Sequence, residues 1–179
     1  KIVGTGPLRE SLERQARSNI EFLGWQDDRR VAELYAACQA FLFPGEEDFG
    51  IVPLEAQACG CPVIAFGRGG ATETVRALGD TTEPTGMFFE EQTTDSLIDA
   101  MEVFERNADR FDPRRIMQIA MLMFMGVSLG WGVLLYTDTL ELDLSKVIPS
   151  VAGPRVAMIL VRRNGSEAGM PKLVQESRR

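Results

Sequence analysis

Residues 41–70 read FLFPGEEDFGIVPLEAQACGCPVIAFGRGG and contain the pattern that decides the fold. The apolar residues 41–43 end a buried strand, and Pro53 lies where the first turn of a helix tolerates a residue without an N–H group. Gly60 fits the position just after that helix. Residues 63–66 then form a second short buried strand. A strand, loop, helix and strand in so short a stretch predict a parallel α/β sheet.

The helix within this stretch is predicted to begin at an anion site. The free backbone N–H groups of Gly50, Ile51 and Val52 carry partial positive charge and can receive phosphate oxygens, and Gly50 lets a ligand approach the backbone closely. Glu47 precedes this site and Glu55 lies within the helix, so each carboxylate would accept hydrogen bonds from hydroxyls beside the phosphate. Ligands of parallel α/β sheets bind at the carboxyl ends of the strands, where this arrangement falls.

The pair Glu47 and Glu55, together with the residues that follow as far as Gly70, resembles the donor-binding core of retaining glycosyltransferases of the GT-B fold, family four. The resemblance covers roughly residues 1–115. It implies an α/β fold with a Rossmann-like parallel sheet, the C-terminal half of a GT-B fold, followed by an atypical C-terminal extension. Other motifs occur in the family's order: GTGP at 4–7, IEFLGW at 20–25, LYAAC at 34–38, TGMFF at 85–89 and a helix over 94–106.

The resemblance implies a role for each matching position. Glu47 would contact hydroxyls of the transferred sugar as the catalytic-site carboxylate, and Glu55 would hold the nucleotide ribose. The remaining donor-binding residues are the turn Phe49, Gly50, Ile51 and Val52 against the sugar and diphosphate, Gly24 and Trp25 beside the nucleobase, and Gly4 and Gly6 near the donor cleft.

Several of these residues have an alternative interpretation. Glu47 belongs to the acidic residues 46–48, which would also suit a solvated loop, and Glu55 would also suit the surface of an amphipathic helix. Trp25 is expected to be a packed wall of the site rather than a stacking platform. Arg68 and Glu73 either touch the donor or pair with each other.

The implied activity is transfer of a hexose from a nucleoside diphosphate sugar to an acceptor hydroxyl with retention at the anomeric carbon. The sequences of the motifs are closest to those of mannosyltransferase-like members, which favours GDP-mannose as the donor. The acceptor would then be a glycan or a lipid-linked molecule, as in cytoplasmic polysaccharide biosynthesis. No metal or other cofactor is expected, because no Asp-x-Asp motif lies near the site. The alternatives are a GT-B-fold epimerase or phosphorylase, and a nucleotide-sugar-binding remnant without turnover.

Two departures from the family pattern concern activity. The basic pair that neutralises the diphosphate in family members has no counterpart, because the sequence begins at Lys1, past that point. The amino-terminal domain that would supply the acceptor site is likewise absent. We therefore expect the sequence to be a fragment of a longer protein and not to catalyse transfer by itself.

Composition narrows the classes of function. The 179 residues are 45% hydrophobic, which suffices for one buried core. The net charge of −7 argues against nucleic acid as a partner, since binding it requires basic residues. The absence of His excludes Ser-His or Cys-His catalysis within the sequence. The three cysteines, at positions 38, 59 and 61, are expected to be buried small apolar residues rather than metal ligands.

The sequence changes character after residue 115. Residues 116–137 contain no charged residue and are long enough to cross a bilayer core, so a buried helix, a membrane-associated segment and a junction with unrelated sequence all stay open. Residues 138–179 carry seven basic and five acidic residues, whereas 12 basic and 21 acidic residues precede them. This tail is expected to be irregular and foreign or disordered, apart from a strand at Val156 to Val161.

Overall fold

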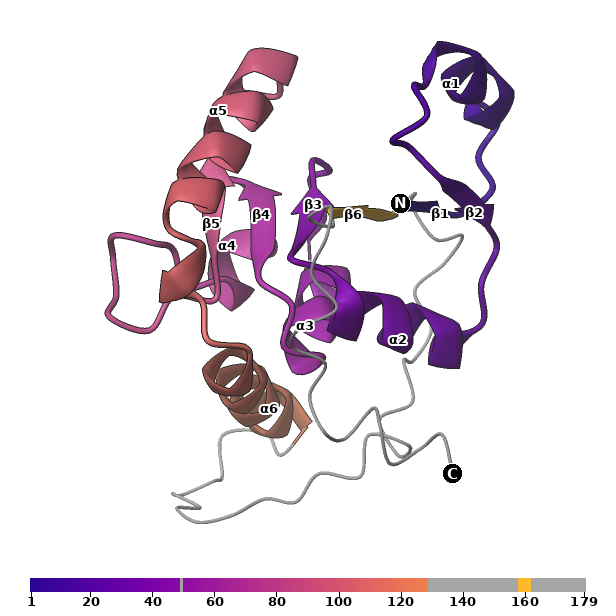
Figure 1. The fold of residues 1–179 in the computed structure, drawn as a ribbon. Coiled ribbons are helices and arrows are strands. Elements are labelled where there is room, and N and C mark those ends of the chain that lie inside the picture. The colour runs from indigo at the N-terminus through magenta and orange to yellow at the C-terminus, as the bar shows by residue number, and fades with distance from the viewer. Residues whose placement is uncertain (49, 129–157, 162–179) are drawn as a thin grey trace.

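Short strands and helices alternate along most of the chain in the computed structural model, which describes residues 1–48, 50–128 and 158–161 (Figure 1). The strands are β1 (Ile2–Val3), β2 (Phe22–Gly24), β3 (Ala40–Phe43), β4 (Val63–Phe66), β5 (Gly86–Phe89) and β6 (Met158–Val161). The helices are α1 (Arg9–Gln15), α2 (Asp28–Ala37), α3 (Ile51–Ala58), α4 (Ala71–Thr74), α5 (Thr94–Arg106), the 3₁₀ turn η1 (Ala108–Arg110) and α6 (Pro113–Ser128).

The six strands form one sheet in the order β2-β1-β6-β3-β4-β5. Neighbouring pairs among β1 to β5 are parallel, whereas β6 is antiparallel to both of its neighbours. The chain proceeds outward from β1 to β2 on one side, and outward from β3 to β4 and β5 on the other. The direction of strand order therefore reverses between β1 and β3, and such a reversal is where parallel α/β sheets bind their ligands.

Both faces of the sheet are apolar, because alternate residues of each strand enter different cores. Phe41 and Phe43 of β3 belong to the core under α2, α3 and α4, whereas Ala40 and Leu42 belong to the core under α5. The ring of Tyr35 meets Phe41 edge-on, with 5.4 Å between the ring centroids. The sheet is thus covered on both faces, as the apolar runs at 41–43 and 63–66 predict.

The ends of the helices follow local sequence signals. Asp27 caps α2 by accepting a hydrogen bond from the Arg30 N–H at 2.8 Å. At the end of α3, Gly60 has φ +79°, and its N–H donates to the Gln57 carbonyl while the Cys61 N–H donates to the Ala56 carbonyl. These two bonds make a Schellman motif. The predicted C′ role of Gly60 is confirmed, as are the predicted helix over 94–106 and strand over 63–66.

Helix α6 covers the first half of the uncharged segment and packs against α3. Ile116 and Ala120 are fully buried, and Ala120 lies in one small core with Leu54 and Ala58 of α3. Over 116–128 the segment is therefore helical, with Ile116 and Ala120 on a buried side, and residues 129–137 lie outside the described residues. Among the helices that the structure describes, none combines the length and the apolar character that a membrane crossing requires.

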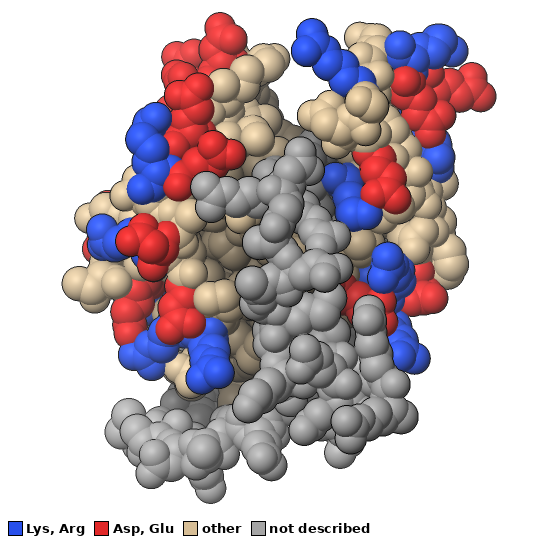
Figure 2. All heavy atoms as spheres, in the orientation of Figure 1, with Lys and Arg blue, Asp and Glu red and all other residues tan. Residues whose placement is uncertain are grey.

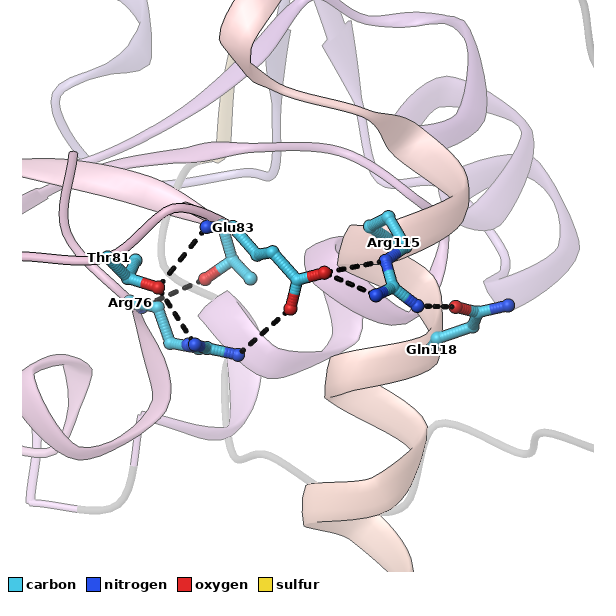
Figure 3. A network of polar contacts seen from close by, with 6 residues as sticks. Arg76, Thr81, Glu83, Arg115 and Gln118 are labelled. Carbon is cyan, nitrogen blue, oxygen red and sulfur yellow. Dashed lines mark hydrogen bonds and ion pairs between the residues drawn. The ribbon is translucent and has the colours of Figure 1, made fainter. Parts of the chain in front are cut away.

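A polar network holds the start of α6 to the loop before β5 (Figure 3). The Arg115 side chain donates from Nε and Nη2 to Oε1 of Glu83, and from Nη1 to Gln118 at 3.0 Å. Arg76 forms an ion pair with Glu83 and donates to the Thr81 hydroxyl at 2.8 Å. Glu83 is thus shared by two arginines from different parts of the chain.

Strand β6 confirms the predicted strand at Val156 to Val161 over its last four residues. Figure 1 shows it between β3 and β1, in the middle of the sheet. The other predictions for residues 129–157 and 162–179 lie outside the described residues.

Candidate donor-binding site

Residues 44–50, which we call the acidic loop because they include Glu46, Glu47 and Asp48, lie between the carboxyl end of β3 and the start of α3. Gly50 precedes the helix with φ +59° and ψ 31°, in the left-handed region that glycine favours. Ile51 and Val52 are then the first two helical residues, so their N–H groups have no carbonyl one turn earlier within the helix. The structure therefore places a positively polarised helix end beside the strand-order reversal, where the sequence predicts the phosphate site.

The loop after β4 supports the acidic loop through backbone contacts. The Gly70 N–H donates to the Glu47 carbonyl oxygen with 2.6 Å between nitrogen and oxygen. A Cβ added at Gly69, which has φ +68°, would lie 2.5 Å from that same oxygen. A Cβ at Gly50 would lie 2.7 Å from the Gly70 carbonyl. The close approach at Gly50 and Gly69 is thus made by the chain's own backbone and not by a ligand, and the lack of a side chain at both glycines permits it.

Gln92, on the loop after β5, holds the first residue of the acidic loop. Its amide Nε2 donates to the Pro44 carbonyl at 3.0 Å. The loops after three neighbouring strands are therefore joined at one edge of the sheet. A ligand at this edge meets a preformed surface built from several segments of the chain.

Glu47 differs from its acidic neighbours in exposure. It is half-buried, whereas Glu46 and Asp48 on either side of it are exposed. Its carbonyl is fixed by Gly70, so the backbone position of Glu47 is defined as well. A uniformly solvated acidic loop would expose all three carboxylates alike. The geometry thus separates Glu47 from the other two. Phe49 lies outside the described residues.

Glu55 lies on α3, half-buried and beside Tyr35 of α2. Burial raises the pKa of the Tyr35 hydroxyl well above its usual range, and the negative charge of Glu55 raises it further. Tyr35 is 2% exposed and packs in the core under α2 and α3. The Glu55 carboxylate is therefore set between the core and the surface, rather than on a fully solvated helix face.

Gly4 and Gly6 lie on the other side of the strand-order reversal, after β1. The Gly4 N–H donates to the Gly24 carbonyl at 2.8 Å, which joins the loop after β1 to the end of β2. Gly6 has nothing within 4 Å of an added Cβ. These predicted positions thus form a second backbone shelf, separated from the acidic loop by the position of β6 in the sheet.

Arg9 is a residue at this second shelf that the sequence analysis missed. Its guanidinium lies over Gly24, where an added Cβ would be 2.7 Å from Nη1, and its Nε donates to Glu13 at 2.7 Å. The signal for it was a basic residue at the first position of the helix that follows the glycine loop. Arg9 brings a positive charge to the edge of the predicted nucleobase region.

Trp25 corrects one prediction. The side chain is 71% exposed, so it is not a packed wall of the site. It directly follows the last residue of β2, where the preceding Gly24 is buried and Trp25 turns outward. A strand of three residues provides too little neighbouring structure to cover an indole.

Arg68 and Glu73 are both exposed and do not pair with each other within the described part of the chain. Instead, the Arg68 guanidinium lies over the ring of Phe66, 5.7 Å from its centroid. Arg68 is the second residue after β4, so this second cation also lies at the carboxyl edge of the sheet. Figure 2 shows basic and acidic side chains mixed over both the α5 side and the α1 side, with carboxylates gathered at the top of the α5 side.

The three cysteines are free, and the thiols of two of them are held neutral. Burial raises the pKa of the Cys59 thiol to about 12 and that of Cys61 well above its usual range. Cys61 is buried as predicted, whereas Cys38 and Cys59 are only half-buried. Within residues 1–48, 50–128 and 158–161, no group of three or more Cys, Asp or Glu side chains has the arrangement of a metal site.

Comparison with known families identifies the class of protein. Residues 1–107 match the family described as Glycosyl transferases group 1, and the chain belongs to this family. Solved structures agree on the fold. Sucrose-phosphate synthase from Thermosynechococcus elongatus superposes with a TM-score of 0.59 and 27% identity, over 71% of this chain and 34% of that one. Anabaena HepE, solved in complex with UDP, shares the fold with a TM-score of 0.51 and 24% identity, over 69% and 35% of the two chains.

Relatives of known activity include mannosyltransferases. The chain is 39% identical over 107 residues to a GDP-mannose-dependent monoacylated alpha-(1-6)-phosphatidylinositol monomannoside mannosyltransferase of Corynebacterium glutamicum, which covers 54% of this chain and 26% of that protein. It is 43% identical over 79 residues to a GDP-mannose-dependent alpha-(1-6)-phosphatidylinositol dimannoside mannosyltransferase of Mycobacterium tuberculosis, over 42% and 21% of the two chains. The chain thus spans about a quarter or less of the length of these relatives.

Proposed function

We propose that the chain is the donor-binding part of a retaining family-four mannosyltransferase that transfers mannose from GDP-mannose to a lipid-linked or glycan acceptor. The observation that carries this proposal is the arrangement at the strand-order reversal. There the α3 start, the half-buried Glu47 and the backbone shelf at Gly4 lie at the same edge of the sheet. Family membership and the mannosyltransferase relatives support the choice of donor.

In the proposed complex the diphosphate binds at the N-terminus of α3. The N–H groups of Gly50, Ile51 and Val52 donate to its oxygens, and the helix dipole stabilises the charge that grows on the leaving diphosphate. No metal takes part in this proposal. Arg68, which lies after β4 at the same edge of the sheet, adds positive charge on this side, whereas Arg9 lies on the nucleobase side over Gly24.

The two acids bind the two sugars of the donor. Glu47 accepts hydrogen bonds from hydroxyls of the mannose, and Glu55 accepts them from the ribose. The backbone of Phe49 contributes to the sugar side, while Gly4, Gly6, Gly24 and Trp25 border the nucleoside. Because Trp25 is exposed, it is available to contact a nucleobase with its ring face.

Calorimetric titration of the chain with GDP, GDP-mannose, UDP and UDP-glucose tests this function. We expect saturable binding with GDP-mannose ahead of UDP-glucose. Glu47→Gln should weaken the binding of GDP-mannose about tenfold and leave the affinity for GDP unchanged. The expected loss corresponds to one charged hydrogen bond of about 1.5 kcal/mol. Gly45→Ala is the matched control on the same loop, because nothing lies within 4 Å of the added Cβ. No saturable heat with any of the four nucleotides would refute the proposal.

A further inference from the structure

The three cysteines of the sequence gather where α2 and α3 end. Cys38 is the residue that ends α2, Cys59 is the residue that ends α3, and Cys61 follows two residues later. The two helices lie side by side on one face of the sheet (Figure 1), and all three side chains pack in the core beneath them. None of these thiols has a part in the proposed donor site.

The pairing of β3 with β4 brings the backbones of Cys38 and Cys61 close together. Phe41 lies opposite Val63 in this ladder. The same register carried back two positions sets Gln39 opposite Cys61, one residue from Cys38. The backbone at Cys38 is already extended, with φ −87° and ψ 160°. The strand spacing and the rise per residue then set the two cysteine Cα atoms about 6 Å apart, within the range that a disulfide spans.

The side chains complete this approach. The thiols of Cys38 and Cys61 lie within hydrogen-bonding reach of each other, and Cys38 Sγ donates to the Tyr35 carbonyl at 3.2 Å. Cys38 is thus held by its own helix with its sulfur beside that of Cys61. For Cys59, the interaction with Cys38 is through charge, without a hydrogen bond. The geometry therefore selects one pair among the three thiols.

We propose that Cys38 and Cys61 form an oxidisable thiol pair, which hydrogen peroxide converts to a disulfide. Cys38 is half-buried and meets the oxidant first, whereas Cys61 is 1% exposed and is the partner behind it. The proposed pair does not depend on the proposed function, because no nucleotide takes part in its chemistry.

The reaction has two balanced steps. The sulfur of Cys38 attacks one oxygen of the peroxide: the S–O bond forms, the O–O bond breaks, and water leaves with the thiol proton. The sulfur of Cys61 then attacks the Cys38 sulfur: the S–S bond forms, the S–O bond breaks, and a second water leaves with the Cys61 proton. Together the two thiols lose two electrons, and one peroxide is reduced to two waters.

Burial determines the order of these steps. It raises the pKa of the Cys61 thiol well above its usual range, with the hydrogen bond to Cys38 as the next cause. Burial also raises the pKa of the Cys59 thiol to about 12. A neutral thiol is a poor nucleophile, so neither of these two residues reacts with peroxide first. Cys61 reacts second because its sulfur already lies beside the oxidised one.

The disulfide would close the segment 38–61 into a loop. This segment contains β3, the acidic loop and α3, and therefore both carboxylates of the proposed donor site. A cross-link of this kind stabilises a fold mainly because it restricts the unfolded chain. We expect oxidation to raise the thermal midpoint by about 5–10 °C, and reduction with dithiothreitol to reverse the rise.

Peptide mapping of the full chain tests the site directly. The folded, reduced protein is treated with hydrogen peroxide, unfolded in N-ethylmaleimide and cleaved after arginine and glutamate. Cys38 then lies in peptide 34–46, and the other two cysteines lie in peptide 56–68. We expect a chain lighter by two hydrogen atoms before alkylation, these two peptides linked through Cys61, and maleimide on Cys59. Three labelled thiols, a bridge to Cys59, a cross-link between two chains or a sulfinic acid without a bridge would each overturn the proposal.

Single substitutions separate the pair from the third thiol. Cys38→Ala and Cys61→Ala should each abolish both the bridge and the rise in thermal midpoint, whereas the matched control Cys59→Ala should keep both. Peroxide also oxidises methionines, and the treated Cys38→Ala variant measures that effect. If the buried Cys61→Ala variant does not fold, Cys38→Ala and the peptide map of the unmodified chain still decide. An equal rise in Cys38→Ala and in the unmodified chain would overturn the proposal.

Discussion

The backbone N–H of Gly70 donates to the carbonyl oxygen of Glu47 across 2.6 Å. This bond joins the loop after β4 to the loop that carries the proposed sugar-binding acid. Gly69 lies against the same oxygen, so the contact leaves no room for a side chain there. The glycines at 69 and 70 therefore act on the site through the position of Glu47.

Gly69→Ala should displace Glu47 and weaken the donor site. The added Cβ would lie 2.5 Å from the Glu47 carbonyl oxygen, and the left-handed backbone at φ +68° costs about 1–2 kcal/mol for a residue with a Cβ. We expect GDP-mannose to bind at least about tenfold more weakly, measured by calorimetry, since a displacement of the loop removes more than one charged hydrogen bond.

Gly79→Ala is the control for that substitution. Gly79 also has positive φ, +105°, but nothing lies within 4 Å of its added Cβ. It should lower the thermal midpoint through backbone strain alone and leave GDP-mannose affinity unchanged. If both variants lost affinity equally, the contact with Glu47 would not be the cause.

Glu55→Gln should weaken the binding of GDP by about 1–3 kcal/mol, the usual cost of leaving polar groups without a hydrogen-bond partner. The substitution also removes the negative charge beside Tyr35, so the pKa of Tyr35 should fall, although burial keeps it above its usual range. Calorimetry measures the first effect, and ultraviolet titration of the tyrosinate band measures the second. A fall in the Tyr35 pKa without any change in GDP affinity would show that Glu55 lies beside the core but does not bind the nucleotide.

Local signals explain why much of the fold could be predicted from sequence. The helix over 94–106 is framed by the cap Thr93, which accepts a hydrogen bond from the Ser96 N–H, and α3 ends at the Schellman glycine Gly60. Such signals depend on neighbours within a few residues of the chain. The continuous apolar runs at 41–43 and 63–66, which are typical of strands buried on both faces, are likewise visible in the sequence.

The contacts that define the site could not be predicted in the same way. The bonds from Gly70 to Glu47 and from Gln92 to Pro44 join residues 23 and 48 positions apart, and no periodic pattern encodes such a pairing. The exposure of Trp25 depends on how little structure surrounds a short edge strand. The place of β6 was also beyond prediction, because a strand that reads as apolar carries no information about which partners it will join.

Stability at high pH should depend on Cys59. Its folded pKa is raised to about 12 by burial, from an ordinary value near 9. Below about pH 9 both states hold a neutral thiol and the stability is fully present. Between pH 9 and 12 only the unfolded chain ionises, so stability is lost as pH rises through the folded pKa. Denaturant unfolding at pH 8 and pH 10.5 should show a smaller loss for Cys59→Ala than for the unmodified chain. An identical loss in the two proteins would contradict this role.

Glu83→Gln should release the start of α6 without unfolding the domain. The carboxylate is shared by Arg76 and Arg115, but all three side chains are at least one-third exposed, so solvent screening limits the loss to about 1 kcal/mol. Hydrogen exchange should quicken in the first turn of α6 and in the loop at 76–85, and stay unchanged in α5. Glu102→Gln, which removes a pair with Arg106 within one helix, is the matched control. Equal effects of the two substitutions at α6 would show that the shared carboxylate has no special part in holding that helix.

Gly86→Ala should be the most damaging single substitution in the sheet. The first residue of β5 lies so close to β4 that an added Cβ would be 2.1 Å from the Val63 carbonyl oxygen and 2.8 Å from Cγ1 of Val75. Neither the carbonyl, which belongs to a central strand, nor the buried Val75 has space to move, so β5 must shift. Overpacking of this kind costs about 1–3 kcal/mol and occasionally more. Chemical denaturation should show a loss of stability in the upper part of that range, whereas Gly45→Ala, with open space around it, should change stability by less than about 0.5 kcal/mol.

Because the β4–β5 pair supports the loop at Gly69 and Gly70, the Gly86→Ala variant should also lose GDP-mannose affinity under conditions where it is still folded. Retention of full affinity there would show that the site is insulated from strain in the strands beneath it.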